Sequence, residues 1–378
     1  MHTPIYFDNA ATTFPKPPAV YDAALLAMRN AGGNPGRGGH PLAQRSGETV
    51  YHARETAAAM FGTEPENVVF TGNCTHALNL AIHGTLRQGD HVIISALEHN
   101  SVARPVAALA ERGIITYSTA PVYPDDAATL RAFEQQIRPE THAVICTLVS
   151  NVTGQILPCR EIAALCRKHG LLFIADGAQA CGVIPVRLTD GIHLLCTAGH
   201  KGLFGLMGTG MLLSDGIVPA TPLMQGGTGS LSNSLRQPDF LPDALETGTV
   251  NVPGIASLDA GMQFVQQFGL SRIFAHESAL CEQVISGLRE IPGITVFRDA
   301  HADYAPVVSF VHERIPASEI GEALAARGFC VRAGIHCSPL AHIFIGTAAS
   351  GTVRFAPSVM NRPQEAERFV RAVRQIVK

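Results

Sequence analysis

The segment LLFIADGAQA, residues 171–180, decides the fold class of this 378-residue chain. Five consecutive apolar residues lead to Asp176, a pattern typical of a parallel strand that is buried on both faces and carries an acid at its carboxyl end. Six more apolar segments of strand length alternate with segments of helical periodicity. They are NVVF (67–70), HVIIS (91–95), GIITYST (113–119), HAVICTLVS (142–150), HLLCTA (193–198) and GTGMLLS (208–214). This alternation predicts an α/β fold with βαβ units around a mostly parallel, seven-stranded sheet.

The chain changes character after the last of these segments. Residues 215–250 are dense in Gly, Ser and Pro and too long for an ordinary connection, which indicates a functional or subunit-contacting loop. The later predicted elements are a helix (254–290), strands ITVF (294–297) and PVVSFV (306–311), a helix SEIGEALAARG (318–328) and a final helix (362–378). We therefore predict a large domain of residues 15–255 and a smaller α+β domain formed by residues 1–14 and 256–378.

Composition narrows the class of protein. Hydrophobic residues make up 46% of the chain and charged residues 16%, which excludes disorder and a fibrous fold. The net charge of −3, with no basic run, argues against a nucleic-acid partner. The start lacks a signal-peptide pattern and no segment has the apolar length of a spanning helix, so we predict a cytoplasmic protein without membrane attachment. The nine cysteines include no C-x-x-C pair, which favours reduced thiols and argues against a metal site.

Asp176 and Lys201 form the first candidate site. Lys201 lies in TAGHKG (197–202), after another predicted strand, so both side chains are expected at the same edge of the sheet, and Gln179 follows Asp176 by one turn. A Schiff-base lysine, with a carboxylate for the pyridinium nitrogen, is what pyridoxal phosphate requires. The alternative is that Asp176 caps a helix and that Lys201 is an ordinary loop lysine.

Three further turns follow predicted strands. In FTGNCTHALNL (70–80), free N–H groups at a helix start and the Thr75 hydroxyl can hold a phosphate, or they form a plain capping motif. In ALEHNS (96–101), His99 can stack on an aromatic cofactor and move protons, although the chain has 16 histidines and most have a surface or capping role. Asn151 in LVSNVTGQILP (148–158) is by itself a typical turn residue.

The last candidates lie near the end of the chain. Cys337, in CVRAGIHCSPLAH (330–342), differs from the other cysteines because His336 and Arg332 make its loop polar and electropositive, which favours a reactive thiolate. A thiol tucked under a loop is the alternative. Arg354, in GTVRFAP (351–357), interrupts an apolar strand-like segment and should therefore face a carboxylate, with a structural salt bridge as the alternative role.

These motifs together resemble one known family. YFDNAATT (6–13), FTGNCT (70–75), LEHNS (97–101), SNVTGQILP (150–158), ADGAQA (175–180), AGHKG (198–202) and RAGIHC (332–337) are similar, in this order, to the cysteine desulfurases of the class V aminotransferase group. That resemblance implies a fold type I pyridoxal phosphate enzyme, with a large cofactor-binding domain and a smaller domain that carries the nucleophilic cysteine.

The resemblance also implies individual roles. The residues implied to bind pyridoxal phosphate are Lys201 (Schiff base), Asp176 (pyridine nitrogen), Gln179 (ring hydroxyl), His99 (stacked on the ring) and, at the phosphate, Cys74, Thr75 and His200. Such enzymes are usually homodimers whose sites borrow a residue from the neighbouring subunit, and ETGTVN (246–251) matches that segment and nominates Thr249.

The implied reaction converts L-cysteine to L-alanine and leaves a persulfide on Cys337. Lys201, Cys337 and His99 are the implied catalytic residues, while Asn151 and Arg354 would hold the substrate carboxylate. A sulfur-acceptor protein or thiol is the expected partner, and selenocysteine is an alternative substrate. The same motifs also fit a class V transaminase or lyase acting on a small amino acid and, less closely, a non-catalytic sulfur-transfer partner of the same fold.

Three residues depart from the family pattern. Ala198 replaces a serine that often donates to the phosphate, Cys74 replaces a small or hydroxyl residue, and His76 stands where an acid is common. These changes predict an altered phosphate site and an atypical subgroup.

Overall fold

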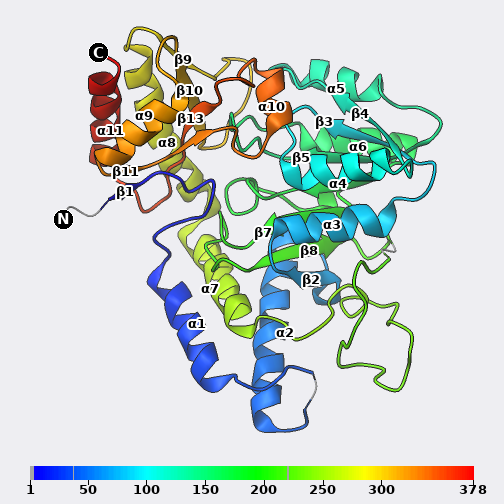
Figure 1. Ribbon diagram of the computed structural model, residues 1–378. Helices are drawn as coiled ribbons and strands as arrows, with labels where there is room; N and C mark the ends of the chain where they lie inside the picture. Colours follow the sequence, from blue (N-terminus) through cyan, green and yellow to red (C-terminus); the bar gives the residue numbers. More distant parts are fainter. Residues whose placement is uncertain (1–3, 37, 219–220) are drawn as a thin grey trace.

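The computed structural model describes residues 4–36, 38–218 and 221–378, so residues 1–3 of the predicted small domain lie outside the described chain. Its central sheet has the strand order β2-β8-β7-β6-β5-β3-β4 (Figure 1). The strands are β2 (Val68–Thr71), β3 (His91–Ser95), β4 (Thr116–Ala120), β5 (Thr141–Thr147), β6 (Leu172–Asp176), β7 (Leu194–Ala198) and β8 (Gly210–Ser214). All seven predicted strands are confirmed. Only β8 runs opposite to the direction shared by the other strands of this sheet, so the prediction of a mostly parallel sheet is also confirmed.

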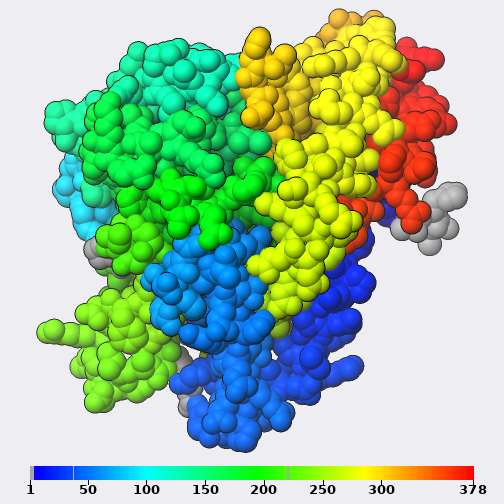
Figure 2. All heavy atoms as spheres, turned by 180° about the vertical axis from the view of Figure 1, so that it is seen from behind, coloured from blue at the N-terminus to red at the C-terminus, as the bar shows by residue number. Residues whose placement is uncertain are grey.

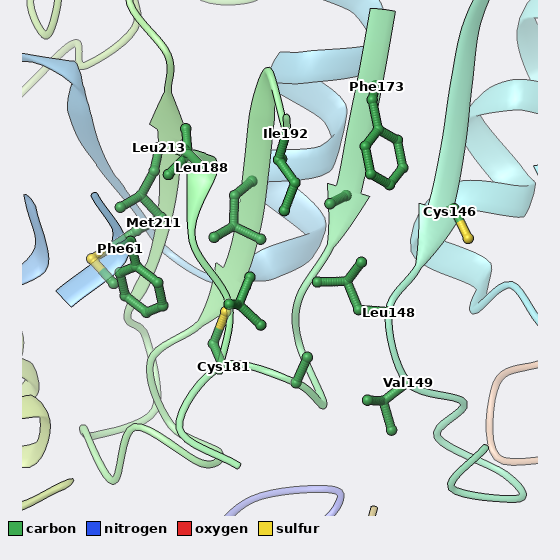
Figure 3. Packing of buried hydrophobic residues seen from close by; sticks show 14 of the residues in the cluster. Phe61, Cys146, Leu148, Val149, Phe173, Cys181, Leu188, Ile192, Met211 and Leu213 are labelled. Atoms are coloured by element: carbon green, nitrogen blue, oxygen red, sulfur yellow. The ribbon is translucent and has the colours of Figure 1, made fainter. Parts of the chain in front are cut away.

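The sheet is buried on both faces because its strands are apolar at successive positions. On one face, Phe173 and Met211 pack with residues of α2 (Pro41–Phe61), α6 (Cys159–His169) and α7 (Val252–Phe268) (Figure 3). On the other face, Ile174 and Leu212 pack against α3 (Cys74–Thr85) and α4 (Asn100–Glu111). This alternation along each strand confirms the interpretation of LLFIAD as a strand covered on both sides.

Two features of the helices differ from the predictions. The single helix expected over 254–290 is wrong, because Gly269, with φ of 95°, divides it into α7 and α8 (Leu270–Arg289). The helices α1 (Pro18–Asn30) and α2 come before the first predicted element and were not anticipated. The helices α5 (Asp126–Glu134) and α6 lie between predicted strands, where the alternation in the sequence predicts helices.

Residues 215–250 form no helix or strand at any described position. In Figure 2 the lime-green part of this segment projects from the body of the molecule beside the blue α2. A broad cavity with an accessible volume of about 1090 Å³ lies between the segment, at Gln225 and Arg236, and Gly38 and Gln44 near the start of α2. The conformation agrees with the prediction of a long irregular loop.

The C-terminal part contains a second sheet, with antiparallel order β12-β13-β10-β9. Its strands are β9 (Ile294–Val296), β10 (Val308–His312), β12 (Arg332–Gly334) and β13 (Thr352–Phe355), and the other elements here are α9 (Ala317–Ala326), α10 (Pro339–Phe344) and α11 (Pro363–Ile376). Phe7 packs with Phe355 and Phe369 in the core of this part. The N-terminal β1 (Ile5–Tyr6) pairs in parallel with β11 (Phe329–Cys330), which places residues from both ends of the chain side by side (Figure 1). The domain boundaries themselves stay a prediction.

No helix within the described residues is long and apolar enough to cross a membrane.

Candidate active site

The carboxyl ends of the parallel strands bring the predicted residues together. Asp176 is the last residue of β6, which pairs with β5 on one side and β7 on the other. Lys201 follows β7 by three residues, and His99 follows β3 by four. Because parallel strands end at one edge of a sheet, these three side chains converge from separate segments of the chain.

Asp176 is 3% exposed and its carboxylate is held by two donors. The backbone N–H of Ala178 donates to Oδ1 at 2.9 Å, and the Cys74 thiol donates to the same oxygen at 3.4 Å. Both described donors use Oδ1, so Oδ2 is free of hydrogen bonds from described side chains and can accept one from a bound group. The start of α3 therefore lies directly beside this carboxylate.

Lys201 presents an amine with no fixed partner. Its Nζ makes no hydrogen bond or ion pair with any residue in the described part of the chain, while its backbone carbonyl accepts from Thr13 Oγ1 at 2.7 Å. Desolvation by burial lowers the pKa of Lys201, and the nearby Asp176 carboxylate partly opposes this effect. A lysine with a lowered pKa supplies more of the neutral amine, the form that reacts with a carbonyl group.

His99 is positioned at the N-cap of α4. Its Nδ1 accepts from the backbone N–H of Ser101 at 3.1 Å and contacts Ser101 Oγ at 2.8 Å, so the ring hydrogen belongs on Nε2. Burial lowers the pKa of His99 to about 4, against the opposing charge of Asp176. Ser101 Oγ also lies 2.7 Å from Thr75 Oγ1, so this serine, which the sequence analysis did not select, connects the His99 ring with the start of α3.

The start of α3 has the features of an anion site. Asn73 accepts the backbone N–H of His76 at 2.9 Å, which leaves the N–H groups of Cys74 and Thr75 without acceptors inside the helix. His200 Nδ1 is buried and has no partner among the described residues, and burial lowers the pKa of His200 to about 4. These unused donors fit a phosphate, so the residues present are compatible with pyridoxal phosphate.

Two of the departures from the family pattern have structural consequences here. Ala198 ends β7 as a buried residue with no side-chain donor. Nδ1 of His76 accepts from the backbone N–H of Gly72 at 3.3 Å, while its Nε2 is buried without a partner in the described chain. Burial lowers the pKa of His76, so a neutral ring replaces the charge of an acid at this turn.

Cys337 lies in a strained loop after β12. Its φ is +59° and that of His336 is +51°, a backbone region that side chains with a Cβ rarely occupy. Arg332 Nη2 donates to Cys337 Sγ at 3.1 Å, and the backbone N–H of Asn100 donates to the Cys337 carbonyl at 2.8 Å. The loop is therefore tied to the residue next to His99, and Arg332 is an electropositive neighbour of Cys337 as predicted. The same prediction for His336 is wrong, because its ring is buried against Thr352, at 2.9 Å, and burial lowers the pKa of His336, which keeps the ring neutral.

Other thiols contrast with Cys337, which is half-buried. Burial raises the pKa of the thiols of Cys74, Cys146, Cys159, Cys166, Cys181, Cys196 and Cys281. Such cysteines behave as small apolar side chains, so Cys337, with its Arg332 donor, is a better candidate nucleophile than these seven.

Arg354 faces a carboxylate, as its place in an apolar strand predicts. Its Nη2 pairs with Asp8 Oδ1 at 2.7 Å, and its Nη1 donates to the Asn151 carbonyl at 3.0 Å. Nε of Arg354 is buried and without a described partner. The Asn151 amide group donates to the His336 carbonyl at 2.8 Å and accepts from Ser338 Oγ at 2.7 Å. Asn151 thus supports both the arginine and the Cys337 loop.

Gln179 and Thr249 have different surroundings. Gln179 Nε2 donates to the Ala10 carbonyl at 2.8 Å, next to the site. Thr249 is exposed, and its hydroxyl accepts from Asn34 at 3.3 Å. No described contact joins Thr249 to Lys201, Asp176 or His99, so its predicted role depends on a second copy of the chain.

Known proteins resemble this chain in sequence and in fold over nearly its whole length. The family model described as Aminotransferase class-V matches residues 5–369. A probable cysteine desulfurase of Mycolicibacterium paratuberculosis is 34% identical over 98% of this chain, and one of Methanothermobacter thermautotrophicus is 30% identical over 96% of it. The chain spans 55% of the mycobacterial relative and 92% of the archaeal one. The apo structure of a cysteine desulfurase from Thermococcus onnurineus NA1 superposes with a TM-score of 0.93 at 28% identity, covering 99% of this chain and 94% of that one.

Proposed function

The chain belongs to the class V aminotransferase family, and from that premise we propose that it is a pyridoxal phosphate-dependent cysteine desulfurase. In this proposal L-cysteine is the substrate, L-alanine is released, and the sulfur remains as a persulfide on Cys337. The observation that carries the proposal is the combination of a half-buried lysine whose amine has no described partner, a strand-end carboxylate and a thiol that accepts from Arg332. A transaminase needs the first two groups but has no use for the third.

The residues that would hold the cofactor are those already described around Asp176 and the start of α3. When bound, pyridoxal phosphate would withdraw electrons from the α-carbon of the substrate. Asp176 would accept from the pyridine nitrogen through the oxygen that its described donors leave open. The N–H groups of Cys74 and Thr75, with the His200 ring, would bind the phosphate.

The remaining steps belong to the chain's own side chains. Lys201, with its lowered pKa, takes and returns the α-proton of the substrate. His99, neutral at pH 7, can carry a proton on Nε2 toward the reacting groups. The Arg332 guanidinium favours the thiolate of Cys337, which attacks the substrate sulfur so that an S–S bond forms as the C–S bond breaks. The electron pair of the C–S bond stays on carbon, which is protonated to give alanine.

Arg354 would hold the substrate carboxylate. It is 1% exposed, it is already oriented by Asp8 and Asn151, and its Nε has no described partner. A guanidinium with spare donors in a fixed plane suits a carboxylate. Thr249 would come from a second subunit, and the sulfur would pass from Cys337 to an acceptor protein or thiol.

The first experiment is an absorbance spectrum of the purified protein, loaded with pyridoxal phosphate, before and after addition of L-cysteine. Alanine and sulfide are assayed in the same samples with a reductant present. We expect a visible cofactor band that changes with cysteine and equal amounts of the two products. The matched variants are Cys337→Ala and Cys330→Ala, because Cys330 is another partly exposed thiol of the same region.

Cys337→Ala should keep the cofactor band and lose both products, whereas Cys330→Ala should retain them. A cofactor band with turnover of amino acids that is independent of Cys337 would move the function to a transaminase or another lyase. L-selenocysteine tested at equal concentration ranks the two substrates.

A further inference from the structure

Residues 12–16 hold both peptide groups that flank Lys201. The carbonyl of His200, which precedes Lys201, accepts from the Thr13 N–H at 3.0 Å, from Thr12 Oγ1 at 3.3 Å and from Lys16 Nζ at 3.0 Å. The carbonyl of Lys201 itself accepts from Thr13 Oγ1 at 2.7 Å. Four donors from one short segment therefore fix the backbone on both sides of the Lys201 α-carbon.

Lys16 is the unusual member of this group. It is 8% exposed, and its ammonium has no carboxylate within 4.0 Å in the described chain. Its partners are the carbonyls of Thr13, at 2.8 Å, and His200. Burial of an ammonium without a counter-ion is unfavourable, and it lowers the pKa of Lys16 to about 8. A side chain that only filled this space could be apolar without loss of stability. The hydrogen bonds that the Lys16 ammonium donates therefore require an explanation.

We propose that Lys16 is a positioning residue for Lys201: its ammonium anchors the His200 carbonyl and so orients the lysine side chain that follows. The inference rests on the proposed function, since it concerns the lysine expected to bind pyridoxal phosphate. Charge-assisted hydrogen bonds are stronger than neutral ones, so a lysine anchors this carbonyl better than a threonine or amide could. Small displacements of a reacting group cost large factors in rate, which gives this anchoring a catalytic consequence.

The test uses the holoenzyme and the variant Lys16→Met, which keeps the length of the side chain and removes its donors. The exposed Lys168, which pairs with Glu134 at 2.8 Å, supplies the control variant Lys168→Met. Two readouts besides activity report the position of the lysine. They are the circular dichroism of the bound cofactor in the visible range and the midpoint of the pH titration of its absorbance.

For Lys16→Met we expect a visible dichroism per bound cofactor at most half that of the parent, a displaced titration midpoint, and a kcat reduced about tenfold with little change in KM. Lys168→Met should match the parent in every readout. Unchanged dichroism and an unchanged midpoint in Lys16→Met would overturn the inference.

A second variant covers the case in which Lys16→Met does not fold. Lys16→Gln removes the charge and shortens the side chain but keeps a polar group in the site, so it should produce the same spectroscopic changes. If Lys16→Gln binds cofactor with the parent's dichroism and midpoint, the anchoring role is refuted. Absence of a cofactor band in the parent protein would instead overturn the proposed function.

Discussion

Replacement of Glu98 by glutamine should stabilise the protein at alkaline pH. Glu98 is fully buried beside His99, and its Oε1 accepts from Ser95 Oγ and from the backbone N–H of Thr147. Its Oε2 has no partner in the described chain. Burial raises the pKa of Glu98 to about 8, because the hydrogen bonds to Oε1 do not compensate for the lost hydration and Asp176 adds repulsion.

The raised pKa of Glu98 determines how the stability of the protein changes with pH. In the unfolded chain the carboxyl ionises near its ordinary pKa of 4.5, whereas in the folded protein it stays protonated up to about pH 8. The stability associated with the protonated group is complete below pH 4.5 and is lost as the pH rises to about 8. At 1.36 kcal/mol per pH unit, the interval from 4.5 to about 8 corresponds to roughly 5 kcal/mol. Glutamine keeps an oxygen for both donors and carries no ionisable proton, so the loss of stability at alkaline pH should disappear.

The assay is the free energy of urea unfolding from pH 5 to pH 9, compared between the parent and Glu98→Gln. The two proteins should be similar at pH 5, and the variant should be more stable by several kcal/mol at pH 9. Glu277, also buried with its pKa raised by burial to about 8, should behave in the same way when replaced by glutamine, whereas the exposed Glu48→Gln should follow the parent. Parallel curves for the parent and Glu98→Gln across this range would refute the reasoning.

Two further predictions concern the thiols of the site. Arg332→Met removes the donor to Cys337 Sγ, so alkylation of Cys337 by iodoacetamide at pH 7 should slow several-fold, as followed by mass spectrometry of the labelled peptide. An unchanged rate would show that Arg332 does not favour the thiolate. Cys74→Ala removes one of the two donors to Asp176 Oδ1, and because a thiol donates weakly we expect only about a two- to threefold faster loss of cofactor on dilution. A tenfold or larger acceleration would mean that Cys74 contributes more than this hydrogen bond.

The sequence predicts the central sheet well because parallel strands buried on both faces are continuous apolar runs. It does not predict α1, since Leu25, Leu26 and Met28 are all at least 46% exposed and obscure the apolar face that the helix buries. The break at Gly269 was also missed, because helical periodicity continues on both sides of one glycine. Both errors arise where burial is decided by tertiary neighbours rather than by local pattern.

The candidate site could be predicted where it depends on strand ends. The rule that side chains converge at the carboxyl edge of a parallel sheet places Asp176, Lys201 and His99 together, and the structure agrees. Contacts that join distant parts of the chain could not be predicted in this way. Thr13 and Lys16 reach Lys201 and His200 across more than 180 residues, and no local pattern carries that information. Only the motif YFDNAATT (6–13), through its resemblance to the family, indicated that the N-terminal segment is related to the function.

The N-terminal segment, residues 8–16, connects groups that are proposed to act on different parts of the reaction. Asp8 pairs with Arg354, the residue proposed to bind the substrate carboxylate, and the Ala10 carbonyl accepts from Gln179. Lys16 anchors the peptide before Lys201. Because one continuous stretch contacts all three groups, the distances among the proposed substrate arginine, the cofactor glutamine and the reactive lysine depend on one backbone path. A change in that path would alter substrate binding and lysine orientation together, so substitutions within the segment should show coupled rather than additive effects.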